Sequence, residues 1–516
     1  WLTIFQPHQK GPQAPFLWKV ADKNGGIAMD KRPNILWLCT DQQRWDTIHA
    51  LGNSFIDTPN LDRLCRQGVA FTNTYCQNPV CTPSRASFLT GRYPSSINAN
   101  INGARNLPEH CTLITKRLAD AGYYCGLVGK LHITSAWNDY EPRMDDGYSY
   151  FCYNLASGHH LNSPGNPYVE WLNQKGVDWH DIFTSDEKHD YHWYRSDAPA
   201  ELRQTAWLAE KAVSFIRERS ACEQPWLLSV NCYDPHPPYD APADLVEKYL
   251  ARNLPDPIYS DADLALNNNL KDFFFQSTAH PTDDAMRRNK ASYYGMIELI
   301  DRHYGRIIDA LDAMGLRENT IVIFNSDHGE MLGDHGLTHK GCRFYEGITH
   351  VPLIISLPGT FRQNAVYGGL VEQTDLAPTI ADLCGIPPAD THGRSLVPVL
   401  TGQNVPAPRK FVRAEFYDTL EVDMNYDGLR APGEIQAAGK PAESCYATMY
   451  YDGRFKLSVY HGIQFGELYD MENDPQEQHN LWYDKDQQDV KQALILDSFE
   501  VSTKYSRPGQ TRRGRY

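Results

Sequence analysis

The sequence lacks any long uncharged apolar run, and it is poor in positive charge. No stretch of about 18 apolar residues occurs, which is the length that a membrane-spanning helix needs, so we expect no membrane span. The 49 lysines and arginines are outnumbered by 64 aspartates and glutamates, which gives a net charge of −15. This balance argues against nucleic acid as the main partner. If the protein binds an anion, a local cluster of cations must attract it.

Paired cysteine spacings and a secretory leader are also missing. The 12 cysteines are scattered through apolar segments, which is typical of reduced thiols rather than of a disulfide framework. Residues 1–28 have no basic start, apolar centre or cleavage site, which argues against a secretory signal. These absences together predict a cytoplasmic protein. Met29 is a candidate natural start, so we expect residues 1–32 to be an N-terminal extension.

Length and composition indicate a large globular α/β protein. A chain of 516 residues, 41% of them hydrophobic, exceeds a single ordinary core. Short buried-strand patterns alternate with helical patterns up to residue 402, which predicts a large mixed, mostly parallel sheet flanked by helices. Beyond this point the apolar runs become shorter and antiparallel in type. We therefore expect a main domain over 33–402 and a smaller α+β subdomain with a tail over 403–516.

The segment from position 81 to 92, CTPSRASFLTGR, is the most distinctive stretch of the chain. Pro83 suits the first turn of a helix and Gly91 its end, so the segment predicts a loop that leads into a short helix. Cys81 then lies at the helix N-terminus, where unpaired amides and the helix dipole favour negative charge. Local physics leaves two interpretations open, an incidental buried cysteine or a reactive one.

Potential metal ligands follow two predicted strands. The apolar run NILWLCT is followed by Asp41 and Gln42, and the run NTIVIF leads to Asp327 and His328. Both runs have the pattern of buried strands in a parallel sheet, and open α/β sheets bind ligands beyond the carboxyl ends of their strands. Two strand ends that each offer oxygen ligands predict a divalent-cation site. Taken alone, Asp41 would fit an ordinary turn equally well.

Basic side chains follow two further predicted strands. Lys130 and His132 come after a strand at 124–128, and His236 lies in the proline-rich loop after a strand at 225–233. The prolines stop that strand and stiffen its loop. In isolation, a solvated lysine and structural histidines would explain these residues too. Position at the strand ends alone leaves both interpretations open.

Helical patterns fill the intervals between these strands. The apolar spacing predicts helices over 59–71, 113–121, 200–218 and 283–314, and an amphipathic helix near 486–499. Strand and helix thus alternate along most of the chain, as expected for an α/β fold.

The order of these motifs resembles that of the formylglycine-dependent sulfatases. Cys-Thr-Pro-Ser-Arg followed by Leu-Thr-Gly-Arg is similar to the signature of this family, a type I branch of the alkaline phosphatase superfamily. Gly-Lys-x-His and His-x-Pro resemble further motifs in family order. The resemblance spans roughly residues 33 to 480 and points to bacterial arylsulfatases, choline-sulfatases and phosphonate monoester hydrolases. It implies an alkaline-phosphatase-like fold and makes 33–402 the catalytic domain.

The resemblance implies a modified cysteine and a metal ion. Cys81 would be oxidised after translation to formylglycine (3-oxoalanine) by a maturation enzyme. One divalent cation would be held by this residue together with Asp41, Gln42, Asp327 and His328. Ca²⁺ is the family's default, but Gln42 and His328 replace the aspartate and asparagine of many sulfatases. The amide lowers the charge and the imidazole softens the site, which makes Mn²⁺ competitive and leaves Mg²⁺ as a third candidate.

The same resemblance assigns roles in a hydrolytic reaction. One hydroxyl of hydrated formylglycine attacks the sulfur of a sulfate monoester while the alcohol leaves. His236, with Lys340, is expected to protonate the alcohol, and His132 to deprotonate the second hydroxyl so that sulfate is expelled. Arg85 and Lys130 hold the diol and compensate charge. The implied substrate contacts are Asn102, Lys130, His236 and Lys340.

The expected reaction is hydrolysis of a small-molecule sulfate ester, and two alternatives stay open. A phosphonate monoester or phosphodiester hydrolase of the same superfamily shares the formylglycine, and some of these enzymes carry Gln and His metal ligands. Lys130 and His132 match sulfatases better. A catalytically silent binder of sulfated ligands would have lost central residues, and none is lost here. Family habit and the basic tail from Arg507 to Tyr516 predict a homo-oligomer.

Overall fold

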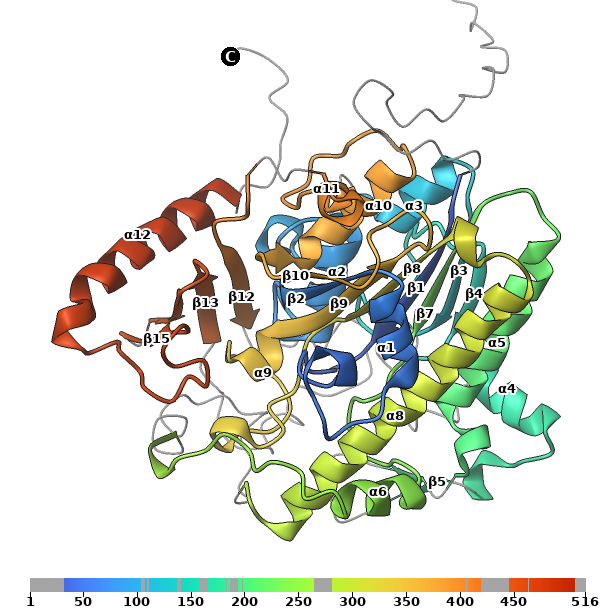
Figure 1. The fold of residues 1–516 in the computed structure, drawn as a ribbon, viewed down its shortest axis with the longest axis horizontal. Coiled ribbons are helices and arrows are strands. Elements are labelled where there is room, and N and C mark those ends of the chain that lie inside the picture. The colour runs from blue at the N-terminus through green and yellow to red at the C-terminus, as the bar shows by residue number, and fades with distance from the viewer. Residues whose placement is uncertain are drawn as a thin grey trace, which may run out of the picture.

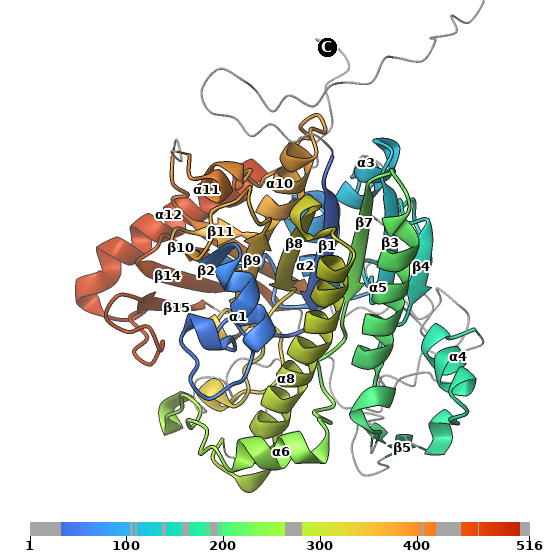
Figure 2. The same cartoon turned by 45° about the vertical axis from the view of Figure 1, so that its right-hand side comes forward.

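Two β-sheets organise the protein (Figure 1). A computed structural model describes residues 32–103, 107–108, 111–136, 141–156, 165–181, 183–185, 194–196, 198–263, 281–403, 407–418, 445–462 and 464–505. The expected N-terminal extension lies outside these residues except for Arg32, and the basic tail lies outside them entirely. Helices pack on both faces of the larger sheet, while the smaller sheet lies at one side of it (Figures 1 and 2).

The larger sheet has nine strands and is mixed but mostly parallel, as predicted. Its strands are β1 (Asn34–Thr40), β2 (Val69–Tyr75), β3 (Tyr124–Gly129), β4 (Tyr150–Tyr153), β7 (Trp226–Asn231), β8 (Thr320–Ser326), β9 (His350–Ser356), β10 (Ala365–Tyr367) and β11 (Val371–Glu372). They lie in the order β10-β2-β9-β8-β1-β7-β3-β4, and β11 pairs with β2. Only β9 runs antiparallel to its neighbours, β2 and β8, among the pairs described in this sheet.

Strand β1 shows why the sheet is covered on both faces. Leu36 and Leu38 point to one face, where they join a buried cluster with α1 (Pro59–Arg66), α5 (Gln204–Ser220) and α8 (Asp284–Ala313). Trp37 points to the opposite face and packs on Phe88 with ring centroids 5.4 Å apart. The helices on that face are α2 (Cys81–Thr90), α3 (Ile114–Asp120) and α10 (Leu376–Leu383). A strand buried on both sides is apolar throughout, which explains the run NILWLCT.

The smaller sheet is antiparallel and belongs to the C-terminal part of the chain. Its order is β12 (Val412–Asp418), β13 (Cys445–Tyr451), β14 (Phe455–His461) and β15 (Phe465–Asp470). Helix α12 (Gln488–Tyr505) lies against it, with Leu494 packed beside Leu457 and Leu468. This arrangement confirms the predicted α+β character, whereas the domain boundary between 402 and 403 stays a prediction.

The predicted helix over 59–71 is wrong in its second half. Helix α1 ends at Arg66, and β2 begins at Val69. Gly68 marks the change, because a side chain there would meet the carbonyl oxygen of Ile355 on β9 at 2.4 Å. The close approach of two strands therefore overrides the helical spacing of the apolar residues.

Within the residues described, no helix has the length and apolar character needed to cross a membrane. Every cysteine whose side chain the structure describes is free, and all of these except Cys222 are buried.

Candidate active site

Four parallel strands bring the predicted site residues to one edge of the large sheet. Strands β8, β1, β7 and β3 are consecutive neighbours, so their carboxyl ends meet there. Thr40 on β1 pairs with Ser326 on β8, which places the next residues, Asp41 and Asp327, side by side. Lys130 follows β3 directly. The sheet topology thus explains how residues far apart in sequence converge.

Cys81 is the first residue of α2, as the sequence predicted. All residues of this helix are buried, and Gly91 ends it in the left-handed region with φ of 72°. The hydroxyl of Ser84 donates to the backbone oxygen of Asp327 over 2.5 Å. The helix is therefore tied to the end of β8 and presents Cys81 to the strand ends.

Four potential ligand atoms gather around Cys81. Its Sγ, the carboxylates of Asp41 and Asp327 and the imidazole of His328 lie within 4.8 Å of one another, and all four residues are buried. Sγ lies 3.2 Å from Nε2 of His328. Nδ1 of His328 lies 2.9 Å from the carbonyl oxygen of Gly329 and donates to it, so Nε2 faces the cluster. Burial opposes the charged ring, but Asp327 and Cys81 raise the pKa of His328, and Nε2 offers its lone pair to a cation when the ring is neutral.

Three cationic side chains neutralise the two carboxylates. Nε of Arg85 donates to Asp327 over 2.8 Å, and its NH2 group lies 3.2 Å from Asp41. Nζ of Lys130 donates to Asp41 over 2.5 Å. Burial opposes the charged form of Asp41, but Lys130 and Lys340 outweigh it and hold its pKa well below its usual range. Asp41 is thus ionised and available as a ligand.

The same cations act on the thiol. Nζ of Lys340 donates to Sγ of Cys81 over 2.9 Å. Burial and the charge of Asp41 would raise the pKa of Cys81, but Lys130 and Lys340, aided by His328, lower it to about 5. Position 81 is therefore an electropositive site that stabilises a negative group.

The two remaining predicted histidines are neutral in this environment. Burial and the charge of Lys130 hold the pKa of His132 well below its usual range, and burial and Lys340 do the same for His236. Nδ1 of His236 lies 2.7 Å from the carbonyl oxygen of Pro237, so the ring proton is on Nδ1. His132 has φ of 53°, and its Nδ1 is buried without a hydrogen-bond partner among the described residues.

Asn102 lies at the start of α2 and not among the cluster's ligands. The residue is exposed, and its Oδ1 accepts a hydrogen bond from the backbone amide of Thr82 over 2.9 Å. This contact caps the helix that carries Cys81. The expected contact between Asn102 and substrate stays a prediction.

Gln42 and Glu330 form a hydrogen-bonded pair, and the sequence predicted only Gln42 as a site residue. Nε2 of Gln42 donates to the carboxylate of Glu330, and both side chains are buried. Oε1 of Gln42 has no hydrogen-bond partner among the described residues. Glu330 was not predicted as a site residue, although its place three residues after Asp327 was a signal.

The donor set fits a divalent cation. Two carboxylates, the imidazole of His328 and a sulfur atom lie within 4.8 Å of one another. The unpartnered amide oxygen of Gln42, whose backbone amide donates to Asp327, is a further candidate oxygen ligand. Hard oxygen ligands suit Ca²⁺, whereas imidazole favours transition ions such as Mn²⁺. The residues therefore fit the cation, and they fit more than one such ion.

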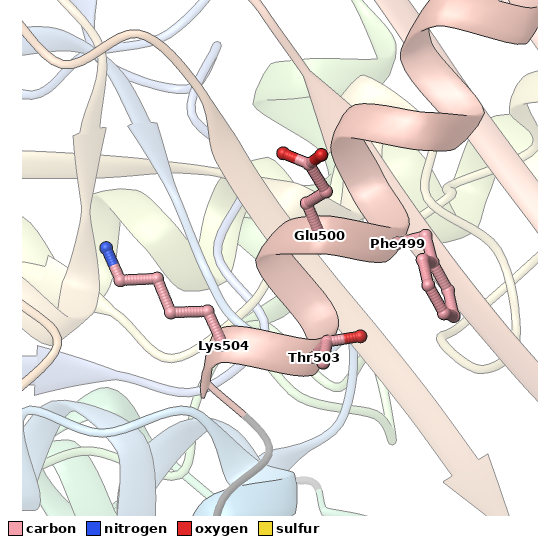
Figure 3. Close-up of a pocket in the computed structure, with 4 residues that line it drawn as sticks. All are labelled: Phe499, Glu500, Thr503 and Lys504. Carbon is pink, nitrogen blue, oxygen red and sulfur yellow. The ribbon is translucent and has the colours of Figure 1, made fainter.

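A pocket on the surface is lined by residues that lie outside the cluster around Cys81. It has a volume of about 410 Å³ and is lined by Phe499, Glu500, Thr503 and Lys504, all near the end of α12 (Figure 3). None of these residues belongs to the cluster around Cys81.

The fold and the buried cluster define a class, the hydrolases of the alkaline phosphatase superfamily. A phosphonate monoester hydrolase of Agrobacterium radiobacter has a similar structure, with a TM-score of 0.76 and 27% identity, and the match covers 92% of this chain and 96% of that one. A multifunctional alkaline phosphatase superfamily protein, PehA of Trinickia caryophylli, is 30% identical over 87% of this chain and 91% of its own length.

The comparison with sequence families is more specific. Residues 33–386 match the family described as Sulfatase. An arylsulfatase of Clostridium perfringens is 31% identical in an alignment that covers 72% of this chain and 79% of that protein. The chain belongs to the sulfatase family.

Proposed function

We propose that the protein hydrolyses sulfate monoesters to an alcohol and inorganic sulfate, using a formylglycine derived from Cys81. The observation that carries this proposal is the convergence of Arg85, Lys130 and Lys340 on the buried cluster around position 81. Three cations at one point in a chain of net charge −15 form the local attraction that an anionic substrate requires. The family supports hydrolysis of a sulfate ester.

The chain's own residues hold and orient the reacting groups. Hydrated formylglycine supplies a nucleophilic hydroxyl and a second hydroxyl for expelling sulfate, and a divalent cation supplies positive charge beside them. Asp41, Gln42, Asp327 and His328 would hold the cation. Arg85 is fully buried and fixed by both aspartates, so it keeps the ligands in place.

Lys340 carries the larger part of the acid role in this proposal. Burial and Lys340 keep His236 neutral, with its proton donated to Pro237, so it has none to give to a leaving alcohol before substrate binds. Lys340 is charged, because burial lowers its pKa but the negative charges of Cys81 and Asp41 more than restore it. An anionic substrate would raise the pKa of His236 and allow it to share the role.

His132 suits the role of a base. Its pKa is low because of burial and the nearby cations, so its ring is neutral and able to accept a proton. Its backbone amide donates to Glu141 over 2.6 Å, which anchors the loop after β3. We assign His132 the proton of the second hydroxyl, whose loss expels sulfate.

Phosphonate monoester hydrolysis is the second candidate. Gln42 and His328 favour it, and so does the structural likeness to the phosphonate monoester hydrolase. A sulfate monoester and a phosphonate monoester each carry one negative charge on a tetrahedral centre, so the cations around Cys81 suit both. The likeness to an arylsulfatase supports the first candidate.

A comparison of two substrates tests this choice. We expect kcat/KM of the matured enzyme to be higher for nitrophenyl sulfate than for a nitrophenyl phenylphosphonate monoester. The reverse order would favour the second candidate. Cys81→Ser serves as the mechanistic control, and we expect it to lower kcat/KM by a factor of about 10³ or more on either ester while the unfolding midpoint stays unchanged.

The proposal has consequences for partners. A formylglycine-generating enzyme must oxidise Cys81, so mass spectrometry of the peptide around this residue is expected to show the aldehyde after co-expression with that enzyme. Full activity with unmodified cysteine would refute the mechanism. A cytoplasmic location and a homo-oligomeric state stay predictions, to be checked by fractionation and light scattering.

A further inference from the structure

Glu330 is a buried carboxylate behind the metal cluster that pairs with no lysine or arginine of the described residues. It is 0% exposed. Its Oε1 accepts hydrogen bonds from two backbone amides, that of Leu332 over 3.0 Å and that of His339. Its Oε2 accepts from Nε2 of Gln42 and lies 4.0 Å from Nδ1 of His339, whose pKa burial lowers. A buried carboxylate without a lysine or arginine partner is costly, which calls for an explanation beyond packing.

The pairing with Glu330 fixes the orientation of the Gln42 amide. A carboxylate accepts hydrogen bonds and donates none, so the NH₂ group of Gln42 must face Glu330. The amide oxygen is then the atom that remains, and it is buried without a partner among the described residues. A buried polar atom without a partner is costly, so it points to a missing ligand.

The backbone of Gln42 is held at the cluster as well. Its amide donates to Oδ1 of Asp327 over 3.0 Å, and its carbonyl oxygen accepts from the hydroxyl of Tyr293 over 2.6 Å. Its φ of 72° is uncommon for a residue with a side chain, and such conformations persist where the surroundings enforce them. The position of Gln42 is therefore set by contacts on both sides.

We propose that Glu330 is a positioning residue that selects the orientation of the Gln42 amide in which oxygen, not nitrogen, is available to the cation. An amide nitrogen has no lone pair to offer a metal, so the opposite orientation would remove one ligand and place two N–H groups beside the cation. This inference rests on the proposed metal-dependent function of the cluster. It concerns how the folded chain orients a metal ligand before the cation binds, and it does not depend on whether the substrate is a sulfate or a phosphonate monoester.

The variant Glu330→Gln tests the idea with little change of shape. The two backbone amides of Leu332 and His339 hold the oxygen of the new side chain, so its NH₂ group must face that of Gln42. Two donors then oppose each other, and the Gln42 amide turns its nitrogen to the cluster. We expect Mn²⁺ affinity to fall about 10- to 100-fold, the range known for residues that orient metal ligands.

A second variant restores the hydrogen bond with reversed polarity. In the double variant that combines Gln42→Glu with Glu330→Gln, the NH₂ group at position 330 donates to one oxygen of the new carboxylate at position 42. The other oxygen of that carboxylate is available to the cation. We expect this double variant to recover the wild-type Mn²⁺ affinity or exceed it. A general loss of packing in Glu330→Gln would not be repaired in this way.

A matched control separates orientation from burial. Glu141 is also a buried carboxylate near the strand ends, and it accepts hydrogen bonds from the backbone amides of His132, Ile133 and Thr134. It makes no hydrogen bond to Gln42 among the described contacts. We expect Glu141→Gln to leave Mn²⁺ affinity within about twofold of wild type.

The measurement is a Mn²⁺ titration of the full-length, metal-stripped protein, followed by the electron paramagnetic resonance of free Mn²⁺. Glu330→Gln that binds Mn²⁺ as tightly as wild type would overturn the inference, and so would failure of the double variant to recover affinity. Wild-type protein that binds Mn²⁺ but hydrolyses neither ester would refute the proposed function alone. Wild-type protein that binds neither Mn²⁺ nor Ca²⁺ would overturn both.

Discussion

Nζ of Lys340 lies 2.9 Å from Sγ of Cys81 and donates a hydrogen bond to it, although 259 positions separate the two residues. The contact joins the loop that follows β8 to the first residue of α2. It places a positive charge at the one thiol whose pKa lies well below the ordinary value among the described cysteines with a resolved shift. Lys340 is therefore central to the electrostatics of position 81.

Removing this charge is expected to raise the pKa of Cys81. In unmatured, metal-free protein, the ultraviolet absorbance of the thiolate should disappear as the pH falls through about 5. Lys340→Met removes a cation that stabilises the thiolate, so the transition should move to higher pH. Cys81→Ala provides the baseline, because it lacks the transition. An unchanged transition in Lys340→Met would show that Lys130 and His328 alone keep the pKa of Cys81 low.

The imidazole of His328 is expected to set the metal preference. Nε2 offers nitrogen to the cluster, and His328→Asn replaces it with an amide oxygen. We expect the affinity for Mn²⁺ relative to Ca²⁺ to fall by about tenfold or more, because oxygen ligands suit Ca²⁺. Competition between the two ions for metal-stripped protein measures this ratio. His303→Asn, on α8 and outside the cluster, should leave it unchanged.

The sequence predicted the strand ends of the site because local pattern determines them. A strand buried on both faces must be apolar, so the runs before Asp41 and Asp327 are visible in the sequence, and the order of motifs indicates the family. The same reasoning predicted the mixed, mostly parallel sheet and the small antiparallel one. The seven residues at positions 41, 81, 85, 130, 327, 328 and 340 do form one contiguous cluster in the structure.

The features that the sequence did not predict depend on contacts between distant segments. The start of strand β2 was assigned to a helix, because its pairing with β9 is invisible in local spacing. The role of Glu330 depends on a hydrogen bond to Gln42, 288 positions away. The neutral state of His236 follows from burial and from Lys340, which only the folded chain brings together. Local propensity carries no information on such pairings.

A buried ion cluster is expected to stabilise the contact between the two sheets. Lys456 on β14 is 1% exposed, and its Nζ lies 2.8 Å from both Glu346 and Glu477. Lys456→Met would leave the buried carboxylate of Glu477 and the partly buried one of Glu346 without this cation, which should lower the free energy of unfolding by about 3 kcal/mol. Urea denaturation measures the change. Arg454→Met removes an exposed ion pair with Asp470 on the same strand pair, so a similarly large loss there would contradict this account.

His392 is expected to make stability depend on pH. Its Nδ1 accepts a hydrogen bond from the backbone amide of Tyr93 over 3.0 Å, which requires the neutral ring. Burial, aided by the charge of Arg92, lowers the pKa of His392 to about 4, whereas the unfolded chain has a value of about 6.5. Because the folded protein binds this proton less readily, the contribution is fully present above pH 6.5 and is lost as the pH falls toward 4.

The variant His392→Asn isolates this contribution, because the amide oxygen of asparagine accepts the same hydrogen bond without titrating. Between about pH 7 and pH 4.5, wild type should lose about 2 kcal/mol more unfolding free energy than the variant, after allowance for the partial exposure of the ring. Urea denaturation at both pH values, with a chelator present, measures the difference while the metal ligands titrate equally in both proteins. Equal losses would mean that His392 titrates normally in the folded state, and its hydrogen bond to Tyr93 would then not govern its protonation.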